Sequence, residues 1–287
     1  MKQDCQIALV QMDSAAGDIE QNINSILNTT NQAVKMGAQF IVFPELALSG
    51  YCPQIISDLA ITLDNPAIKL LSKTAVDSQV TLLVGFPESS DDLLKPYISQ
   101  LIALPDGSLE VYRKVHLGRS EKEWFTAGDE LPVFTSHGVK FAVGICWDWH
   151  FPELAAVYSL KGAEVLFAPH ASPSISGDRL EIWNKYMPAR AYDNTVYLAA
   201  CNMCGSDYMG RNYSGGSAVW GPKGETLAKY SNNVANILCV NLSAERLNKL
   251  RVRERTSMKD SFFLADRRKE LYQILLELDI EPTPQDS

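Results

Sequence analysis

The pattern of apolar and polar positions divides the chain into short strands that alternate with helices. The apolar run over residues 6–12 predicts a first strand, and apolar residues at helical spacing over 19–34 predict a helix that ends at Gly37. Asn65 followed by Pro66 is typical of a helix start. Similar patterns predict strands over residues 40–43, 81–86, 139–145, 165–168, 196–200 and 236–240, and helices over 66–79, 152–160 and 180–193.

Two hairpins interrupt this alternation. Residues 98–104 and 109–115 flank the turn sequence Pro-Asp-Gly, and residues 217–220 and 225–229 flank Gly-Pro-Lys-Gly. Helices that alternate with strands, together with hairpins, predict an α/β fold in which helices cover mixed sheets.

The helical pattern over residues 180–193 contains Pro188, so we expect a kink or a break there. No shift in composition divides the chain. We therefore expect one domain over residues 1–287, with a C-terminal extension from about residue 258 and a short tail over 281–287.

Composition and charge narrow the classes of partner. The 287 residues include 26 Lys+Arg and 34 Asp+Glu, which gives a net charge of −8 and argues against nucleic acids and anionic membranes. No apolar run approaches the ~18 residues that a membrane span needs, and the first run is too short for a secretory signal. The six cysteines are expected to be reduced and mostly buried. These features predict a cytoplasmic protein.

Reactive side chains follow three of the predicted strands. Glu45 comes after the strand over 40–43, Lys114 closes the strand of the first hairpin, and Cys146 ends the strand over 139–145. Because ligands in α/β proteins gather beyond the carboxyl ends of strands, these side chains can reach one crevice. A cysteine near a helix start and an ammonium group is biased toward the nucleophilic thiolate.

Other interpretations of the same residues stay open. Each of the three is also explained by packing or solvation at a strand end. His150, four residues after Cys146, offers a competing Cys–His pair. Cys201 and Cys204 form a lone CxxC, which is explained either by a metal or redox role or by simple burial of two small residues. The sequence lacks GxGxxG, GxxxxGK[ST], HExxH and GxSxG, the usual motifs of nucleotide binding, zinc proteases and serine hydrolases.

Three segments resemble the signature blocks of the nitrilase, or carbon–nitrogen hydrolase, superfamily. They are Phe-Pro-Glu-Leu-Ala-Leu-Ser-Gly-Tyr over residues 43–51, Tyr-Arg-Lys-Val-His-Leu over 112–117, and Gly-Ile-Cys-Trp-Asp-Trp-His-Phe-Pro-Glu over 144–153. They occur in the order and at the approximate spacing of the family, and the resemblance runs from residue 6 to about 241. It implies a four-layer α-β-β-α sandwich of two mixed sheets.

The resemblance also implies roles for individual residues. Cys146 matches the nucleophile, Glu45 the general base, and Lys114 a group that stabilises the tetrahedral intermediate. The second glutamate of the family matches Glu121, with Glu123 as the neighbouring alternative. The resemblance implies no metal and no organic cofactor.

The substrate implied is a small linear amide or an N-carbamoyl amine, hydrolysed through a Cys acyl-enzyme with release of ammonia. Cys146-Trp147-Asp148 resembles the amidase and N-carbamoylputrescine amidase branches, whereas nitrilases usually carry Cys-Trp-Glu. D-amino-acid carbamoylases place arginines where this chain has Trp149 and His150, which argues against a carboxylate clamp at that point. The alternatives are a nitrilase and a catalytically idle member that serves as a binding subunit.

Aromatic residues near the nucleophile are expected to line the substrate pocket. The candidates for substrate contact are Tyr51, Trp124, Trp147, Trp149 and His150. By resemblance we also expect a homodimer or higher homo-oligomer, packed through residues 180–193 and the segment after Ser257.

Overall fold

The computed structural model describes residues 1–89, 94–207, 210–252, 257 and 262–277. This part of the chain forms two six-stranded sheets. In spatial order, the first sheet consists of β12 (Asn236–Leu242), β1 (Cys5–Gln11), β2 (Phe40–Val42), β3 (Thr81–Glu88), β4 (Tyr97–Ala103) and β5 (Leu109–Arg113). The second consists of β11 (Thr226–Tyr230), β10 (Ser217–Trp220), β9 (Tyr197–Asn202), β8 (Val165–His170), β7 (Val139–Val143) and β6 (Phe134–Ser136).

Both sheets are mixed. β1, β2 and β3 run parallel, as do β7, β8 and β9, while the outer strands pair antiparallel. The parallel strands lie at the centre of each sheet. The carboxyl ends of β2 in the first sheet, and of β7 and β8 in the second, lead into loops that can carry functional side chains.

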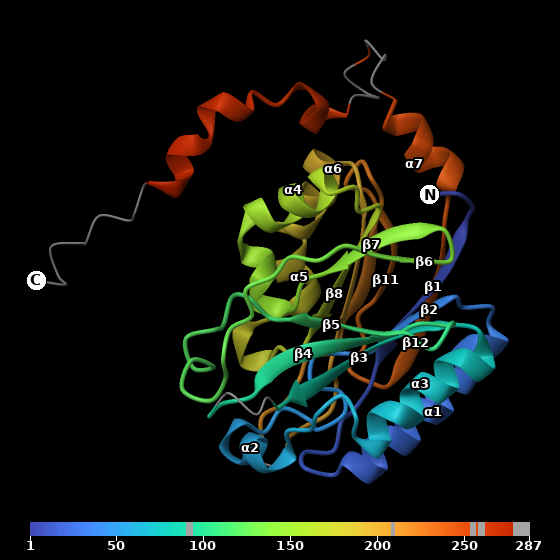
Figure 1. Cartoon of the computed structure of the whole chain (residues 1–287), viewed down its shortest axis with the longest axis vertical. Coiled ribbons are helices and arrows are strands. Elements are labelled where there is room, and N and C mark those ends of the chain that lie inside the picture. The colour runs from blue at the N-terminus through green and yellow to red at the C-terminus, as the bar shows by residue number, and fades with distance from the viewer. Residues whose placement is uncertain (90–93, 208–209, 253–256, 258–261, 278–287) are drawn as a thin grey trace, which may run out of the picture.

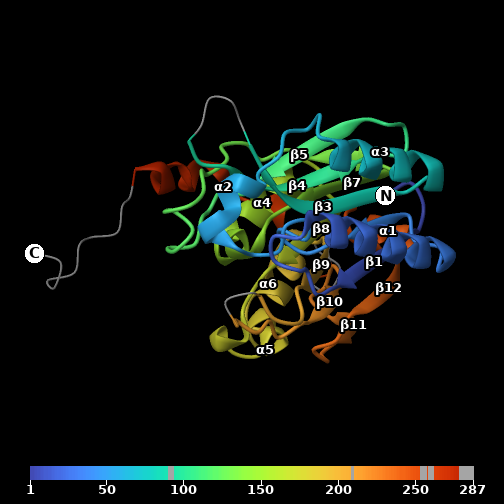
Figure 2. The same cartoon turned by 90° about the horizontal axis from the view of Figure 1, so that it is seen from below.

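Helices cover the outer faces, so that α1 and α3 lie on one side of the two sheets and α4, α5 and α6 on the other (Figures 1 and 2). This confirms the predicted four-layer sandwich. The helices are α1 (Ile19–Lys35), α2 (Ile56–Leu59), α3 (Pro66–Ser78), α4 (Pro152–Leu160), α5 (Arg179–Trp183), α6 (Met187–Asn194) and α7 (Ala244–Leu250). No helix in the described ranges combines the length and the apolarity that crossing a bilayer requires.

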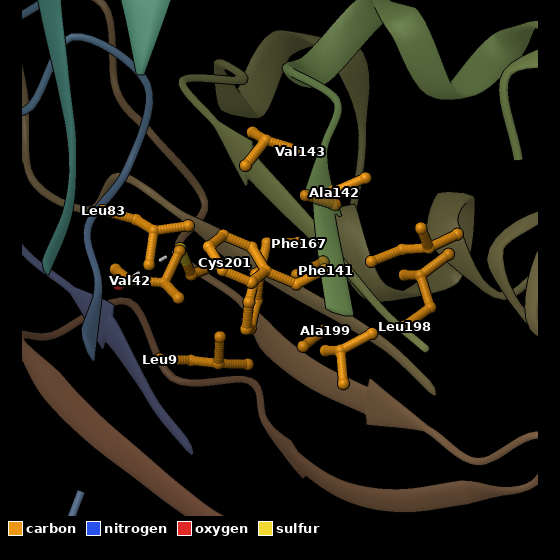
Figure 3. Packing of buried hydrophobic residues seen from close by; sticks show 14 of the residues in the cluster. Leu9, Val42, Leu83, Phe141, Ala142, Val143, Phe167, Leu198, Ala199 and Cys201 are labelled. Carbon is orange, nitrogen blue, oxygen red and sulfur yellow. Dashed lines mark hydrogen bonds between the residues drawn. The ribbon is translucent and has the colours of Figure 1, made fainter. Parts of the chain in front are cut away.

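The two sheets pack face to face through buried apolar side chains, among them Leu9, Val42 and Leu83 of the first sheet and Phe141, Phe167 and Ala199 of the second (Figure 3). The Phe40 ring on β2 lies 5.2 Å from the ring of Phe141 on β7 and 5.7 Å from that of Phe167 on β8. Cys201 belongs to this core, where its Sγ lies 3.6 Å from the carbonyl oxygen of Val42. The core fixes β2 against β7 and β8, and thereby fixes the loops that follow them.

Local sequence signals set most element boundaries. The Asn65 side chain accepts a hydrogen bond from the N–H of Ala67 and caps α3, as Asn-Pro predicts. The helix predicted over 180–193 is split into α5 and α6, and Pro188 occupies the first turn of α6. The hairpins β4–β5 and β10–β11 form as predicted.

The structure also contains elements that the sequence pattern does not predict. These are the short strand β6, the helices α2 and α7, and the 3₁₀ turn Cys146–His150. In the predicted C-terminal extension, residues 262–277 form short 3₁₀ turns that begin beside α6, where Phe263 packs against Tyr192. The predicted tail over residues 281–287 lies outside the described residues.

Candidate active site

Cys146 lies at the start of the turn that follows β7. Its φ of +48° is in the left-handed region, which is unfavourable for a residue with a side chain and must be maintained by surrounding contacts. The Trp149 indole N–H donates to the Gly144 carbonyl at 2.6 Å, and the N–H of Ile145 donates to the Asp148 carboxylate at 2.8 Å. A Cβ on Gly144 would lie 2.9 Å from the Trp149 ring, so the turn depends on glycine there. These contacts hold the thiol beyond the carboxyl end of β7.

Glu45 and Lys114 form a buried ion pair. Lys114 Nζ lies 2.7 Å from Glu45 Oε1, and both side chains are fully excluded from solvent. Glu45 follows β2 in a loop that packs against β3 at Gly85, where a Cβ would come within 2.3 Å of that loop's backbone. The backbone therefore brings together two residues separated by 69 positions in the sequence.

Glu45 is joined to the Cys146 thiol through the loop after β8. Its second oxygen, Oε2, accepts a hydrogen bond from the N–H of Ala171 at 2.9 Å. The hydroxyl of the next residue, Ser172, lies 3.4 Å from Cys146 Sγ. Asn202 holds Ser172 in place through both its N–H and its carbonyl oxygen. The carboxylate and the thiol thus meet at one two-residue segment.

A second carboxylate completes the cluster. Glu121 Oε1 accepts hydrogen bonds from Lys114 Nζ at 2.8 Å and from the Tyr51 hydroxyl at 3.1 Å. Its Oε2 accepts from the N–H of Gly118 at 2.6 Å. Glu121 is buried, whereas Glu123 is exposed. Of the two candidates for the second glutamate, Glu121 is therefore the one that contacts Lys114.

The pKa of the Cys146 thiol differs from what the sequence predicts. Burial raises the pKa of Cys146 to about 12, the negative charges of Glu45 and Glu121 add to this, and Lys114 and Ser172 only partly oppose it. The expected bias of Cys146 toward the thiolate is therefore wrong in direction. The expected helix start is a 3₁₀ turn, and a lone ammonium is outweighed by two carboxylates and by desolvation.

The two partners of the buried ion pair are also shifted. Burial raises the pKa of Glu45, and Lys114 counteracts this only in part. Burial alone would lower the pKa of Lys114, but Glu45 and Glu121 outweigh it and hold that pKa well above its usual value. Lys114 is therefore held as an ammonium and Cys146 as a thiol, while Glu45 accepts a proton more readily than an ordinary glutamate.

A cavity of about 560 Å³ opens over Cys146. Three of the predicted substrate contacts, Tyr51, Trp147 and His150, line it. Trp149 and Trp124 do not. Trp149 is fully buried beneath the turn, since the 3₁₀ backbone directs it inward toward Gly144, and Trp124 packs against the apolar core.

The histidines do not form the alternative Cys–His pair. The His150 ring lies 4.7 Å from the ring of Trp147 and 4.9 Å from that of Tyr186. Among the described side chains, the hydrogen-bond partner of the thiol is Ser172. His116 is bound to Asp148 through its backbone N–H and Nδ1, at 2.8 and 3.0 Å.

Several residues of the site were missed from the sequence. Ala171 and Ser172 follow β8, and Asp148 joins the Cys146 turn to Tyr112 on β5 through a hydrogen bond of 2.7 Å. Arg179 on α5 also lines the cavity. The rule that placed Glu45 and Cys146 after strand ends applies equally to 170–172, and it could have identified Ser172.

Within the described ranges, no group of three or more histidine, cysteine or acidic side chains is placed to hold a metal ion. Cys201 and Cys204 are both buried free thiols. Cys201 belongs to the core between the sheets, and the backbone N–H of Cys204 bonds Met12. Burial in the fold accounts for both residues of the CxxC.

Residues 6–252 match the family model of carbon–nitrogen hydrolases. The chain belongs to the carbon–nitrogen hydrolase family. It is 31% identical over 277 residues to a probable nitrilase of Schizosaccharomyces pombe, covering 94% of this chain and 98% of the relative. It is 29% identical over 303 residues to the N-carbamoylputrescine amidase of Oryza sativa subsp. japonica, covering 96% of each chain.

A solved member of the family gives the same architecture. It is a glutamate-to-glutamine variant of the amidase from Nesterenkonia sp. AN1, with the acetamide moiety of fluoroacetamide covalently added at its active-site cysteine. This carbon–nitrogen hydrolase superposes on it with a TM-score of 0.79 at 28% identity, covering 94% of this chain and 95% of the amidase. The chain is accordingly a carbon–nitrogen hydrolase with an active-site cysteine, as predicted.

Proposed function

We propose that this carbon–nitrogen hydrolase cleaves small linear amides or N-carbamoyl amines through an acyl-enzyme on Cys146. The proposal depends on the observation that Glu45 and Cys146 contact adjacent residues of one loop. The Glu45 carboxylate accepts a hydrogen bond from the N–H of Ala171, and the Cys146 thiol lies beside the hydroxyl of Ser172. Lys114 neutralises the Glu45 side of this arrangement. A nucleophile, a base and a cation thereby share one buried corner beneath a cavity large enough for a small amide.

In the acylation step, Glu45 takes the proton of the Cys146 thiol while sulfur bonds to the carbonyl carbon. The carbonyl electron pair moves to oxygen, and Lys114 Nζ with the backbone N–H of Trp147 stabilises the resulting negative charge. When the C=O bond re-forms, the C–N bond breaks and the Glu45 carboxyl returns its proton to the leaving nitrogen. Ammonia departs and a thioester remains.

In the deacylation step, Glu45 takes a proton from water as the water oxygen bonds to the thioester carbon. Collapse of the intermediate breaks the C–S bond, and the proton returns to sulfur. Glu121 has a supporting role, because it binds Lys114 and Tyr51 together and so orients the ammonium beside the cavity. Each step uses only the described side chains, the amide and water.

An ammonia-release screen over aliphatic amides, N-carbamoyl amines and nitriles tests this proposal. We expect release from one of the first two classes, and its loss by on the order of 10⁴-fold or more in Cys146→Ala. Cys239→Ala is the matched control, because Cys239 is another partly exposed thiol, on β12, away from the cavity.

The other outcomes decide between the alternatives. Release only from nitriles would identify a nitrilase and overturn the substrate class proposed. No release from any class would favour the idle binding subunit, and release that survives Cys146→Ala would refute the acyl-enzyme.

A further inference from the structure

The cavity over Cys146 contains a cation that the hydrolytic cluster does not use. Arg179 begins α5 and lines the cavity, yet only 6% of the residue is exposed. Its Nε is buried and has no hydrogen-bond partner among the described residues, and no described carboxylate lies within ion-pair distance. A guanidinium is charged at any physiological pH and is rarely buried unless it is paired.

The other cations that line the cavity or lie beneath it are either paired or exposed. Lys114 is held between Glu45 and Glu121. Arg211 bonds Asp207 through Nε at 2.7 Å, and Arg119 is exposed. Arg179 therefore differs from the remaining positive side chains of this wall in being buried without a counter-charge.

The position of Arg179 is fixed by packing. Its aliphatic stem lies against the backbone at Gly216, where a Cβ would be 3.6 Å from that of Arg179. Tyr186 lines the same cavity as Cys146 and Arg179. Burial and the charge of Cys146 raise the pKa of Tyr186, whereas the charge of Arg179 and a side-chain hydrogen bond with it lower that pKa. Tyr186 is therefore a neutral neighbour of the guanidinium and gives it no counter-charge.

We propose that Arg179 binds a carboxylate at the end of the substrate remote from the scissile amide. The planar fork of a guanidinium matches the two oxygens of a carboxylate, and a single unpaired cation is matched by a single negative charge. The substrate is then a linear ω-amide that carries a carboxylate, or the N-carbamoyl derivative of an amino acid. The sequence argues against a carboxylate clamp at Trp149 and His150, and in this proposal Arg179 supplies one from α5.

This inference rests on the proposed amide hydrolysis, but binding tests it without turnover. Dissociation constants are measured with the Cys146→Ala protein for succinamate, glutaramate and adipamate. Each is paired with the neutral amide in which a methyl group replaces the carboxylate: butyramide, pentanamide and hexanamide. 4-Aminobutanamide serves as the cationic member of the series.

At the best-fitting length, we expect the anionic amide to bind about 10- to 100-fold more tightly than its neutral partner, the range for a charge-assisted hydrogen bond in a desolvated site. Arg179→Gln in the same background removes this preference and leaves the affinity for the neutral amide unchanged. Arg179→Lys restores part of it, because the charge remains and the fork is lost. Lys73→Gln is the control for net charge, since Lys73 is exposed on α3 and paired with Asp77.

Equal affinity for the anionic and neutral partners at every length would overturn the inference, as would a preference that survives Arg179→Gln. Tighter binding of the cationic amide, or no binding of any member, would overturn it too. Ammonia release separates this failure from a failure of the proposed function. If neutral amides are hydrolysed and their hydrolysis depends on Cys146, the proposed function is supported and only the carboxylate site is rejected.

Discussion

The Lys114 ammonium lies 2.7 Å from the Glu45 carboxylate, and neither side chain is exposed to solvent. Glu121 approaches the same ammonium at 2.8 Å, so two carboxylates surround one cation. With both carboxylates ionised, the group carries one net negative charge beside the thiol of Cys146. Burial is the main reason that the pKa of that thiol is raised, and this negative charge adds to it. In the mechanism that we propose, proton transfer to Glu45 therefore generates the nucleophile.

The pH profile of kcat/KM should reflect the raised pKa of Glu45. Glu45 must be ionised to accept the thiol proton, so activity falls as pH drops through its folded-state pKa, which lies above 4.5. The acidic limb should therefore be centred above 4.5, and it belongs to the coupled cluster rather than to one residue. A limb centred at or below 4.5 would contradict the desolvation of Glu45.

Replacing the central cation should cost both activity and stability. Lys114→Met leaves Glu45 without its cation, and we expect the free energy of unfolding at neutral pH to fall by about 3–5 kcal/mol, with loss of ammonia release. Loss of the cation raises the folded-state pKa of Glu45 further above its unfolded value, so the deficit is largest where Glu45 is charged and shrinks as pH falls. Urea titrations of both proteins across pH measure this difference. A deficit that grows at low pH would contradict the account.

Alkylation by iodoacetamide should distinguish the cysteines. Cys146 lines the cavity and has Glu45 nearby as a base, whereas Cys239 is partly exposed on β12 and has a raised pKa without such a base. Peptide mass spectrometry should find Cys146 modified first, and Glu45→Gln should slow its modification at least tenfold. Equal rates at Cys146 and Cys239, or no effect of Glu45→Gln, would argue for an inert thiol.

Asp148 should act as a positioning residue. Its carboxylate accepts hydrogen bonds from Ile145, from Tyr112 and from the N–H of His116, and it does not line the cavity. Asp148→Asn keeps the size but cannot accept all of these, so the free energy of unfolding should fall by about 1.5–3 kcal/mol. Because the turn at Cys146 loosens, kcat should drop more than KM rises. A change confined to KM would assign Asp148 to substrate binding instead.

The sequence predicts the fold where short-range signals act. Strands at the centre of both sheets, the Asn65 cap and the break at Pro188 follow from spacing and turn residues, and the structure confirms them. The short strand β6 and the 3₁₀ turn after Cys146 depend on tertiary contacts, such as the bond from Trp149 to Gly144, and no local pattern encodes those. This is also why Trp149 was wrongly expected at the cavity.

The candidate site is predicted to a similar extent. The strand-end rule and the resemblance selected Glu45, Lys114 and Cys146, and the fold places these residues around one corner. The raised pKa of the thiol and the unpaired Arg179 could not be predicted, because both depend on burial and on which charges face each other. The cytoplasmic location and the homo-oligomer stay predictions.

Partitioning of the acyl group between water and hydroxylamine tests the Cys146 acyl-enzyme most directly. An amide and the methyl ester of the same acid are hydrolysed in the presence of hydroxylamine, and the ratio of hydroxamate to free acid is measured for each. We predict one common ratio, because both substrates pass through the same thioester, and no hydroxamate above the enzyme-free level from either substrate with Cys146→Ala. Different ratios for the two substrates, or hydroxamate above the enzyme-free level with Cys146→Ala, would contradict the acyl-enzyme.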